Sequence, residues 1–201
     1  KDDGSFEGST KTRAALSYDP VTQTFKYIRD NEEIYTFNSA GKLIRIENDQ
    51  NQIVTLTYQN GKLHTVSDTR GNALTFAYNA NNLISTITTQ NGKVTTYTYG
   101  TNKQVTKVVN AEGVTFNYTY DTSKRVKTLS NELGGVTTNT YNASHQVTRQ
   151  VDPLGRIMTF VYSGNLQAGT TQIKYPNLKV IEETYFRGQL TKKVENFGKA
   201  N

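Results

Sequence analysis

Short stretches in which apolar and polar residues alternate recur along this chain of 201 residues. In residues 94–99 (VTTYTY), two tyrosines alternate with threonines. Side chains on a β-strand point to opposite faces in turn, so this pattern predicts strands with one aromatic or apolar face and one threonine face. The position two residues before each recurring tyrosine holds Leu56, Phe76, Tyr97, Tyr118, Asn139 and Phe160. Asn139 is the polar exception, and the sequence offers no explanation for it.

These stretches belong to a repeat with a period of 20 or 21 residues. The recurring aromatic positions are Phe37, Tyr58, Tyr78, Tyr99, Tyr120, Tyr141 and Tyr162. An aliphatic series follows them at five or six residues and consists of Leu43, Leu63, Leu83, Val105, Val126 and Val147. The aromatic and aliphatic series recur with the same period, which indicates one repeated supersecondary unit. We place six such repeats in residues 37–162 and give the aromatic series a structural role.

Each unit also contains a turn with defined chemistry. In Asp68-Thr69-Arg70-Gly71 the first residue caps a type I turn, and the fourth accepts the left-handed conformation that follows. The glycines at this place are Gly71, Gly92, Gly113, Gly134 and Gly155. A second polar turn, such as Gln59-Asn60-Gly61, leads to the next unit. We therefore predict an all-β fold, an antiparallel meander of about eight repeated β-hairpins in one ribbon sheet, curled because open sheets of this width rarely stay flat.

The strand after each second turn leaves one question open. Leu63 and Val66 are three residues apart, so a regular strand would place them on opposite faces. Either both faces are partly covered, or a β-bulge lies between these two residues.

The ends of the chain depart from the repeat. Residues 1–17 are polar and aperiodic, which predicts a leader, a linker or a loosely attached edge. Residues 18–36 predict an irregular entry hairpin whose first strand follows Asp19-Pro20. Residues 163–201 predict degenerate repeats that are truncated at the C-terminus.

Within that last segment we expect a turn of a different kind at Tyr175-Pro176-Asn177-Leu178. Half a unit then restarts at Arg187-Gly188. A chain that stops in mid-repeat and begins at Lys1 is expected to be a processed or excised piece of a longer protein.

Composition removes several classes of function. The chain has no Cys and two His, which excludes disulfides, thiolate zinc sites and Cys nucleophiles and argues against a His-rich metal site. No apolar run approaches the ~20 residues that cross a bilayer, and no signal peptide is recognisable. The 31 threonines and 13 tyrosines favour half-exposed β-surfaces.

Charge is distributed unevenly along the chain. Residues 1–100 hold ten basic and ten acidic residues, whereas residues 101–201 hold thirteen and seven. This excess fits an acidic partner, and it also fits lysines that keep solvated strand edges from aggregating.

Residues that could carry chemistry are few and scattered. His64 and His145 lie in different repeats. The adjacent carboxylates of Glu32-Glu33 and of Glu182-Glu183 would point to opposite faces of a strand, so neither pair forms a general acid and base. No nucleophile elbow, phosphate loop or zinc-binding helix motif is present. We expect no catalytic residue, no cofactor and no metal.

The aromatic face is the remaining candidate for a binding surface. Its regular spacing favours packing or the lining of an enclosed space over the stacking platform of a nucleic-acid binder, so nucleic acid is not an expected partner. A carbohydrate- or protein-binding module at the cell surface is the alternative function. Its candidate residues are Phe76, Tyr97, Tyr118 and Phe160.

The pattern Tyr-x-x-x-Gly-x-Leu/Val-x-x-Val-x-Asp/Asn-x-x-Gly resembles the tyrosine–aspartate (YD) or Rhs repeat family. The resemblance covers residues 35–162 well and residues 163–201 in part. The Asp after the Tyr is present at Tyr18-Asp19 and Tyr120-Asp121. Elsewhere its place is taken by Gln59, Asn79, Gly100, Asn142 and Ser163.

The resemblance implies a β-ribbon that spirals into a hollow shell, as in bacterial Rhs proteins, wall-associated toxins, insecticidal toxin complexes and teneurins. It implies a non-enzymatic, structural segment of a secreted or cell-wall-associated bacterial toxin. Its partners would be the rest of a larger parent chain and a C-terminal toxin domain that the shell encloses or presents.

One turn also resembles a motif of known chemistry. Rhs proteins carry an aspartate-dependent self-cleavage motif similar to Asp152-Pro153-Leu154-Gly155. Here Arg156 follows the glycine and no second such motif is present. We therefore interpret this segment as a hairpin turn.

Overall fold

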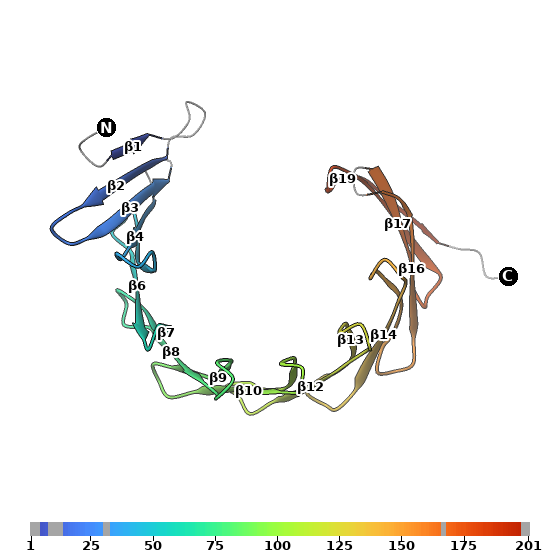
Figure 1. Ribbon diagram of the computed structural model, residues 1–201. Helices are drawn as coiled ribbons and strands as arrows, with labels where there is room; N and C mark the ends of the chain where they lie inside the picture. The colour runs from blue at the N-terminus through green and yellow to red at the C-terminus, as the bar shows by residue number, and fades with distance from the viewer. Residues whose placement is uncertain (1–4, 8–13, 30–32, 166–167, 198–201) are drawn as a thin grey trace. The chain divides into compact units, whose positions relative to one another are not determined.

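The computed structural model describes residues 5–7, 14–29, 33–165 and 168–197, in which strands alternate with turns (Figure 1). The strands of these ranges are β1 Ser5–Glu7, β2 Ala15–Asp19, β3 Thr24–Arg29, β4 Glu33–Phe37, β5 Leu43–Asn48, β6 Ile53–Gln59, β7 Lys62–Asp68, β8 Ala73–Tyr78, β9 Ile84–Thr89, β10 Val94–Tyr99, β11 Val105–Val109, β12 Thr115–Tyr120, β13 Val126–Ser130, β14 Val136–Tyr141, β15 Val147–Val151, β16 Ile157–Gly164, β17 Ala168–Lys174, β18 Lys179–Phe186 and β19 Gln189–Phe197.

Each strand pairs with its neighbours in sequence, so the predicted all-β antiparallel meander is confirmed. The chain divides into two compact units, Lys1–Thr96 and Tyr97–Asn201, and each is described by itself. In the first unit the pairing runs from β1 to the beginning of β10. In the second it runs from β11 to β19.

The first turn of each repeat adopts the predicted conformation. Asp68 Oδ1 accepts hydrogen bonds from the backbone N–H groups of Arg70 and Asn72, both at 2.9 Å. Gly71 has φ +86°, in the left-handed region that only glycine enters without strain. The other four glycines have φ angles of +80° (Gly92), +84° (Gly113), +78° (Gly134) and +77° (Gly155).

In the second turns after Tyr78, Tyr99, Tyr120 and Tyr141, the same left-handed position is occupied by a residue other than glycine. After Tyr120, the Asp121 Oδ1 atom accepts from the N–H groups of Ser123 at 2.9 Å and Arg125 at 3.0 Å, and Lys124 has φ +63°. The equivalent residues are Asn82 (φ +63°), Lys103 (φ +61°) and His145 (φ +63°). A left-handed L-residue costs about 1–2 kcal/mol, so polar composition alone does not predict this conformation at Lys or His.

A β-bulge follows the second turn and answers the question that the sequence left open. Thr57 pairs with Thr65 but Tyr58 pairs with Leu63, so His64 is an extra residue. Leu63 and Val66 therefore both lie on the aromatic face, opposite Tyr58 and Leu56 respectively. Equivalent register shifts occur at Thr36/Phe37, Ala77/Tyr78, Thr119/Tyr120, Thr140/Tyr141 and Thr184/Tyr185.

One member of the predicted aliphatic series needs correction. The residue opposite Tyr78 is Ile84, whereas Leu83 closes the preceding turn by accepting a hydrogen bond from the Asn79 N–H. In this unit the second turn has five residues, as it does after Tyr120. The two-residue turns at Asn60-Gly61 and Arg187-Gly188 bring the aliphatic residue one position closer to its tyrosine.

The two faces are sorted as predicted, but neither is covered by a second layer in the described ranges. In β10 and β12 the tyrosines are half-buried, while Thr96, Thr98 and Thr119 are exposed. The buried residues among those described are Ile181 at 6% exposure and Thr36 at 8%, and no described side chain is fully buried. The chain therefore gains stability from contacts within a single sheet rather than from an enclosed core.

The ends contain more regular structure than the sequence indicates. Strand β2 ends at Asp19, and β3 follows the turn and pairs with both β2 and β4. The entry hairpin expected at residues 18–36 therefore lies within a set of three paired strands. Part of residues 1–17 lies outside the described ranges.

Near the C-terminus two expectations are corrected. The turn at Tyr175–Leu178 is of the ordinary five-residue type, because Tyr175 N–H donates to Lys179 O at 2.8 Å and Leu178 has φ +66°. Tyr185 lies opposite Leu190 beside a bulge, as Tyr58 lies opposite Leu63. The repeat therefore continues at a tyrosine 23 residues after Tyr162. The spacing is longer because Tyr162 lies opposite Thr171, nine residues on, whereas Tyr141 lies opposite Val147, six residues on.

Replacement of Gly71 or Gly155 by Val should lower the free energy of unfolding by about 1 kcal/mol or more, since a β-branched residue is strained at positive φ. The space around each site is open, so the cost comes from the backbone alone. Thermal melts would measure it. Arg70→Val, in the same turn without positive φ, is the matched control, and equal melts for Gly71→Val and Arg70→Val would contradict the turn assignment.

Candidate functional site

The recurring tyrosines link neighbouring strands through their hydroxyl groups. In the first unit, Tyr58 donates to the backbone carbonyl of Leu43 at 2.8 Å and Tyr78 to that of Leu63 at 2.9 Å. In the second unit the hydroxyl–carbonyl links are Tyr120–Val105 at 2.6 Å, Tyr141–Val126 at 2.7 Å and Tyr162–Val147 at 2.8 Å. Every link spans 15 residues.

These links lie where the backbone ladder stops. Strands β5 and β6 are in register from Glu47↔Ile53 to Arg45↔Thr55, and Leu43 lies two residues beyond the last pair. The other linked pairs also have three registered positions. A buried carbonyl without a partner costs free energy, so the tyrosine hydroxyl supplies a donor where the next strand has moved out of reach.

The links form a chain from one repeat to the next. Val126 lies opposite Tyr120 and accepts the hydrogen bond of Tyr141. Val147 lies opposite Tyr141 and accepts that of Tyr162. Each tyrosine thus packs across one hairpin and is anchored to the residue that packs against the previous tyrosine.

Basic side chains form a second link between repeats. Lys42 Nζ lies 4.9 Å from the ring centroid of Tyr58 and donates to Gly61 O. Lys62 Nζ lies 5.1 Å from the Tyr78 ring and donates to Asn82 Oδ1. Contacts of this kind combine a cation–π attraction with a hydrogen bond to the next turn.

In the second unit Arg125 has this role. Its guanidinium carbon lies 4.5 Å from the Tyr141 ring centroid, and its Nη1 donates to Asn142 O at 2.9 Å. Asp121 Oδ2 accepts from Arg125 Nε at 2.7 Å and fixes its orientation. The Asp that follows Tyr120 in the sequence thereby caps its own turn and positions the link to the next one.

The electrostatics of these groups follow from their partners. The pKa of the Asp121 carboxyl is lowered, first by the Arg125 backbone N–H and then by its guanidinium, against an opposing effect of burial. The Asn72 side chain is the main cause that lowers the pKa of Asp68. Burial raises the pKa of the Tyr120 and Tyr162 hydroxyls, which keeps them protonated and able to donate.

The hydrogen bonds of Asn139 explain why a polar residue occupies this position of the aromatic face. Its Nδ2 donates to Val126 O at 3.2 Å, and its Oδ1 accepts from Gln150 Nε2 at 3.0 Å. The amide therefore shares the carbonyl that Tyr141 uses, and Gln150 lies directly opposite on β15. Phe37, which begins the aromatic series, has no hydroxyl and cannot form such a link.

The four candidate binding residues lie on the aromatic face and are half-buried. Phe76 lies opposite Ile87, Tyr118 opposite Leu129 and Phe160 opposite Ile173. These are ordinary cross-strand packing pairs, so a role in binding stays a prediction.

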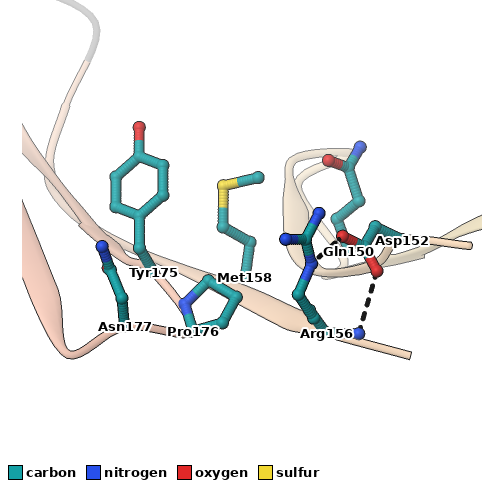
Figure 2. Close-up of a pocket in the computed structure, with 7 residues that line it drawn as sticks. All are labelled: Gln150, Asp152, Arg156, Met158, Tyr175, Pro176 and Asn177. Carbon is teal, nitrogen blue, oxygen red and sulfur yellow. Dashed lines mark hydrogen bonds and ion pairs between the residues drawn. The ribbon is translucent and has the colours of Figure 1, made fainter. Parts of the chain in front are cut away.

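Figure 2 shows a hollow of about 610 Å³ in the second unit, where Tyr175 and Met158 stand side by side and Arg156 faces Asp152. Asp152 Oδ2 accepts from Arg156 Nε at 2.6 Å, and Oδ1 accepts from the N–H groups of Leu154 and Arg156, both at 2.9 Å. The Asp152–Gly155 segment is therefore a capped hairpin turn, as the sequence indicates, and its carboxylate is fully engaged.

Groups with catalytic potential are dispersed among the described residues. His64 lies in a bulge of the first unit, and His145 in a turn of the second. Glu182 and Glu183 point to opposite faces, and Glu32 lies outside the described residues. No group of three or more His, Cys, Asp or Glu side chains in the described ranges could hold a metal ion. The described residues also contain no helix that is long and apolar enough to cross a bilayer.

Tyr120→Phe should lower the free energy of unfolding by about 1 kcal/mol, because it leaves the Val105 carbonyl without its hydroxyl donor. Chemical denaturation would measure the loss. Tyr118→Phe is the matched control on the same strand, since its hydroxyl makes no hydrogen bond to the described residues. Equal losses in the two variants would show that the hydroxyl link contributes nothing specific.

Acid should weaken the fold through the capping carboxylates. Folding lowers the pKa values of the Asp68 and Asp121 carboxyls. Their ionised carboxylates therefore stabilise the folded state at any pH above the ordinary Asp pKa of about 3.9. This stabilisation is lost as the pH falls through the lower pKa values of the folded state. Melting temperatures should therefore fall steeply below about pH 4. The Asp68→Asn/Asp121→Asn double variant should show a shallower decline. An unchanged acid profile would refute the role of these caps.

Among solved structures, the chain resembles "Crystal Structure of TcdB2-TccC3 without hypervariable C-terminal region" (12% identity, TM-score 0.43) and "Structure of Photorhabdus luminescens Tc holotoxin pore, Mutation TccC3-D651A" (12% identity, TM-score 0.43). In both cases the match covers 90% of this chain and 14% of the other. Likeness at this level carries no functional argument.

The chain thus spans about one seventh of the length of these solved chains. A search of curated proteins finds no match. Residues 14–196 match the protein family described as Teneurin YD-shell, which accounts for most of the chain and agrees with the tyrosine repeat. The chain therefore belongs to the Teneurin YD-shell family of YD/Rhs-repeat proteins.

Proposed function

We propose that this chain is a wall segment of a repeat-built shell in a secreted or surface bacterial toxin, and that the shell encloses or presents a C-terminal effector. The observation that carries the proposal is the tyrosine link itself. It joins successive repeats at Tyr58 and Tyr78 in the first unit and at Tyr120, Tyr141 and Tyr162 in the second, which is what a wall assembled from many hairpins requires. The hydroxyl of Tyr185 donates instead to Glu183 Oε2 at 2.7 Å. Family membership supports the same function.

The exposure of both faces adds to this proposal. An isolated globular domain encloses apolar side chains, whereas here Ile181 and Thr36 are the buried residues among those described, and neither is fully enclosed. A wall has an inner and an outer surface, and both must tolerate water or a cargo. No group of three or more His, Cys, Asp or Glu among the described residues could hold a metal ion, and the role proposed for the segment is structural.

A carbohydrate- or protein-binding module at the cell surface is the second candidate. Its supporting observation is that Tyr97 and Tyr118 remain partly exposed on the aromatic face, where a sugar ring could stack on them. Binding to a glycan array that is lost in Tyr97→Ala or Tyr118→Ala would favour the module over the shell.

In the parent protein, the segment that follows the repeat array should resist protease while the shell is intact. The Tyr120→Phe/Tyr141→Phe/Tyr162→Phe triple variant removes three hydroxyl links and should expose that segment, because the wall opens more often. Limited proteolysis with mass spectrometry measures the cleavage rate. Tyr118→Phe is the control and should leave protection unchanged. If the segment is cleaved as fast in the intact parent as in isolation, enclosure is wrong.

A further inference from the structure

Charge is divided unequally between the two faces of the second unit. We define its threonine face by residues that lie directly opposite one another in the ladders, since opposed residues share a face. The chain of pairs includes Lys107↔Asn117, Thr119↔Thr128, Thr140↔Arg149, Arg149↔Thr159, Thr159↔Lys174, Thr170↔Thr184 and Thr184↔Lys192. Four basic side chains thus project from a surface of hydroxyl groups.

These four cations are exposed and form no ion pair with the described residues. Lys107, Arg149 and Lys174 are exposed on their strands, as is Lys192 on β19. The carboxylate that shares the face is Glu182, which lies opposite Gln172 and Val194. The threonine face therefore carries an uncompensated positive charge.

The opposite face differs, because its cations are paired. Lys179 Nζ lies 2.7 Å from Glu195 Oε2. Lys193 Nζ lies 3.9 Å from Glu183 Oε1 and 3.8 Å from Glu195 Oε1. Four of the thirteen basic residues of 101–201 thus lie on the threonine face without an ion pair to the described residues, where they can meet a partner.

We propose that the threonine face of the second unit binds an acidic polypeptide segment, rich in Asp and Glu, through Lys107, Arg149, Lys174 and Lys192. Charge complementarity sets the sign of the partner. Threonine hydroxyls between the cations can donate further hydrogen bonds to carboxylates. Arg149 and Lys174 lie two strands apart, roughly 10 Å at the usual strand spacing. This matches side chains three residues apart in a peptide of polyproline II conformation, where three residues make one turn of about 9 Å and share a face.

Other polyanions fit this face less well. Single-stranded nucleic acids need aromatic rings on which bases stack, and sugars likewise use ring faces. In this unit the tyrosines and Phe160 lie on the opposite face. On the threonine face, Phe186 is an exposed ring two residues from Thr184 on β18, and the Arg187 guanidinium carbon lies 5.3 Å from its centroid. One ring gives no platform for successive bases, so this surface of cations and hydroxyls suits carboxylates on a peptide. The inference concerns this face alone and holds whether or not the parent protein encloses an effector.

The test measures binding of poly-L-glutamate to the 201-residue chain by fluorescence anisotropy. The Arg149→Gln/Lys174→Gln variant should weaken binding about tenfold, the size expected for two exposed ion pairs. Lys179→Gln/Lys193→Gln is the matched control, because it removes the same net charge from the opposite face. It should change the affinity less than about twofold. Circular dichroism confirms that both variants are folded.

The outcomes separate the proposal from its rivals. Affinity should fall as salt rises, since exposed charges are screened. If both double variants bind poly-L-glutamate with equally weakened affinity, net charge alone explains the binding, and the proposal is wrong. Oligothymidylate or heparin binding more tightly than poly-L-glutamate, with the same dependence on Arg149 and Lys174, would assign the face to another polyanion. Absence of poly-L-glutamate binding at low salt would also refute it. Effector protection in the parent is measured separately, so either idea can fail alone.

Discussion

The hydrogen bond from a tyrosine hydroxyl to a carbonyl 15 residues earlier is the interaction on which the rest of this fold depends. Each first-turn hairpin that carries a tyrosine link pairs over three positions, after which its strands separate. Without a donor at that point, the separation would leave carbonyls exposed to an apolar surface. Tyrosine serves because its ring covers that surface while its hydroxyl reaches the carbonyl. Phenylalanine would satisfy only the first requirement.

A structure of this kind is stabilised between neighbours rather than around a centre. Each repeat contacts the one before and the one after, as in other repeat proteins, so stability is close to a sum of local terms. The cations over tyrosine rings and the capped turns add to that sum at every step. Local damage should therefore open a repeat without unfolding distant ones.

The sequence predicts the repeat, the two faces and the first turns, because each follows from side-chain alternation or from a glycine with one conformational role. The sequence does not predict those features of the backbone that depend on how side chains pack. The bulge at His64 is undecidable from residue types, since His fits a strand as well as a bulge. The left-handed Lys124 and His145 have no sequence signal beyond the Asx residue three positions earlier. Tyr185 was missed because the loop before it is longer, although Tyr–x–x–Gly matches Tyr58 to Gly61.

The length of the repeat is not fixed, yet the links always span 15 residues, because insertions and deletions fall in the second turn, outside the link. Gene duplication can therefore add or remove whole hairpins, and a second turn can shrink to two residues, without moving any tyrosine off its carbonyl. Loss of a single strand would make every later strand run in the opposite direction, so its antiparallel pairing with the remaining neighbour would be lost. Such an array can change its length in evolution only by pairs of strands, while its surfaces diverge freely.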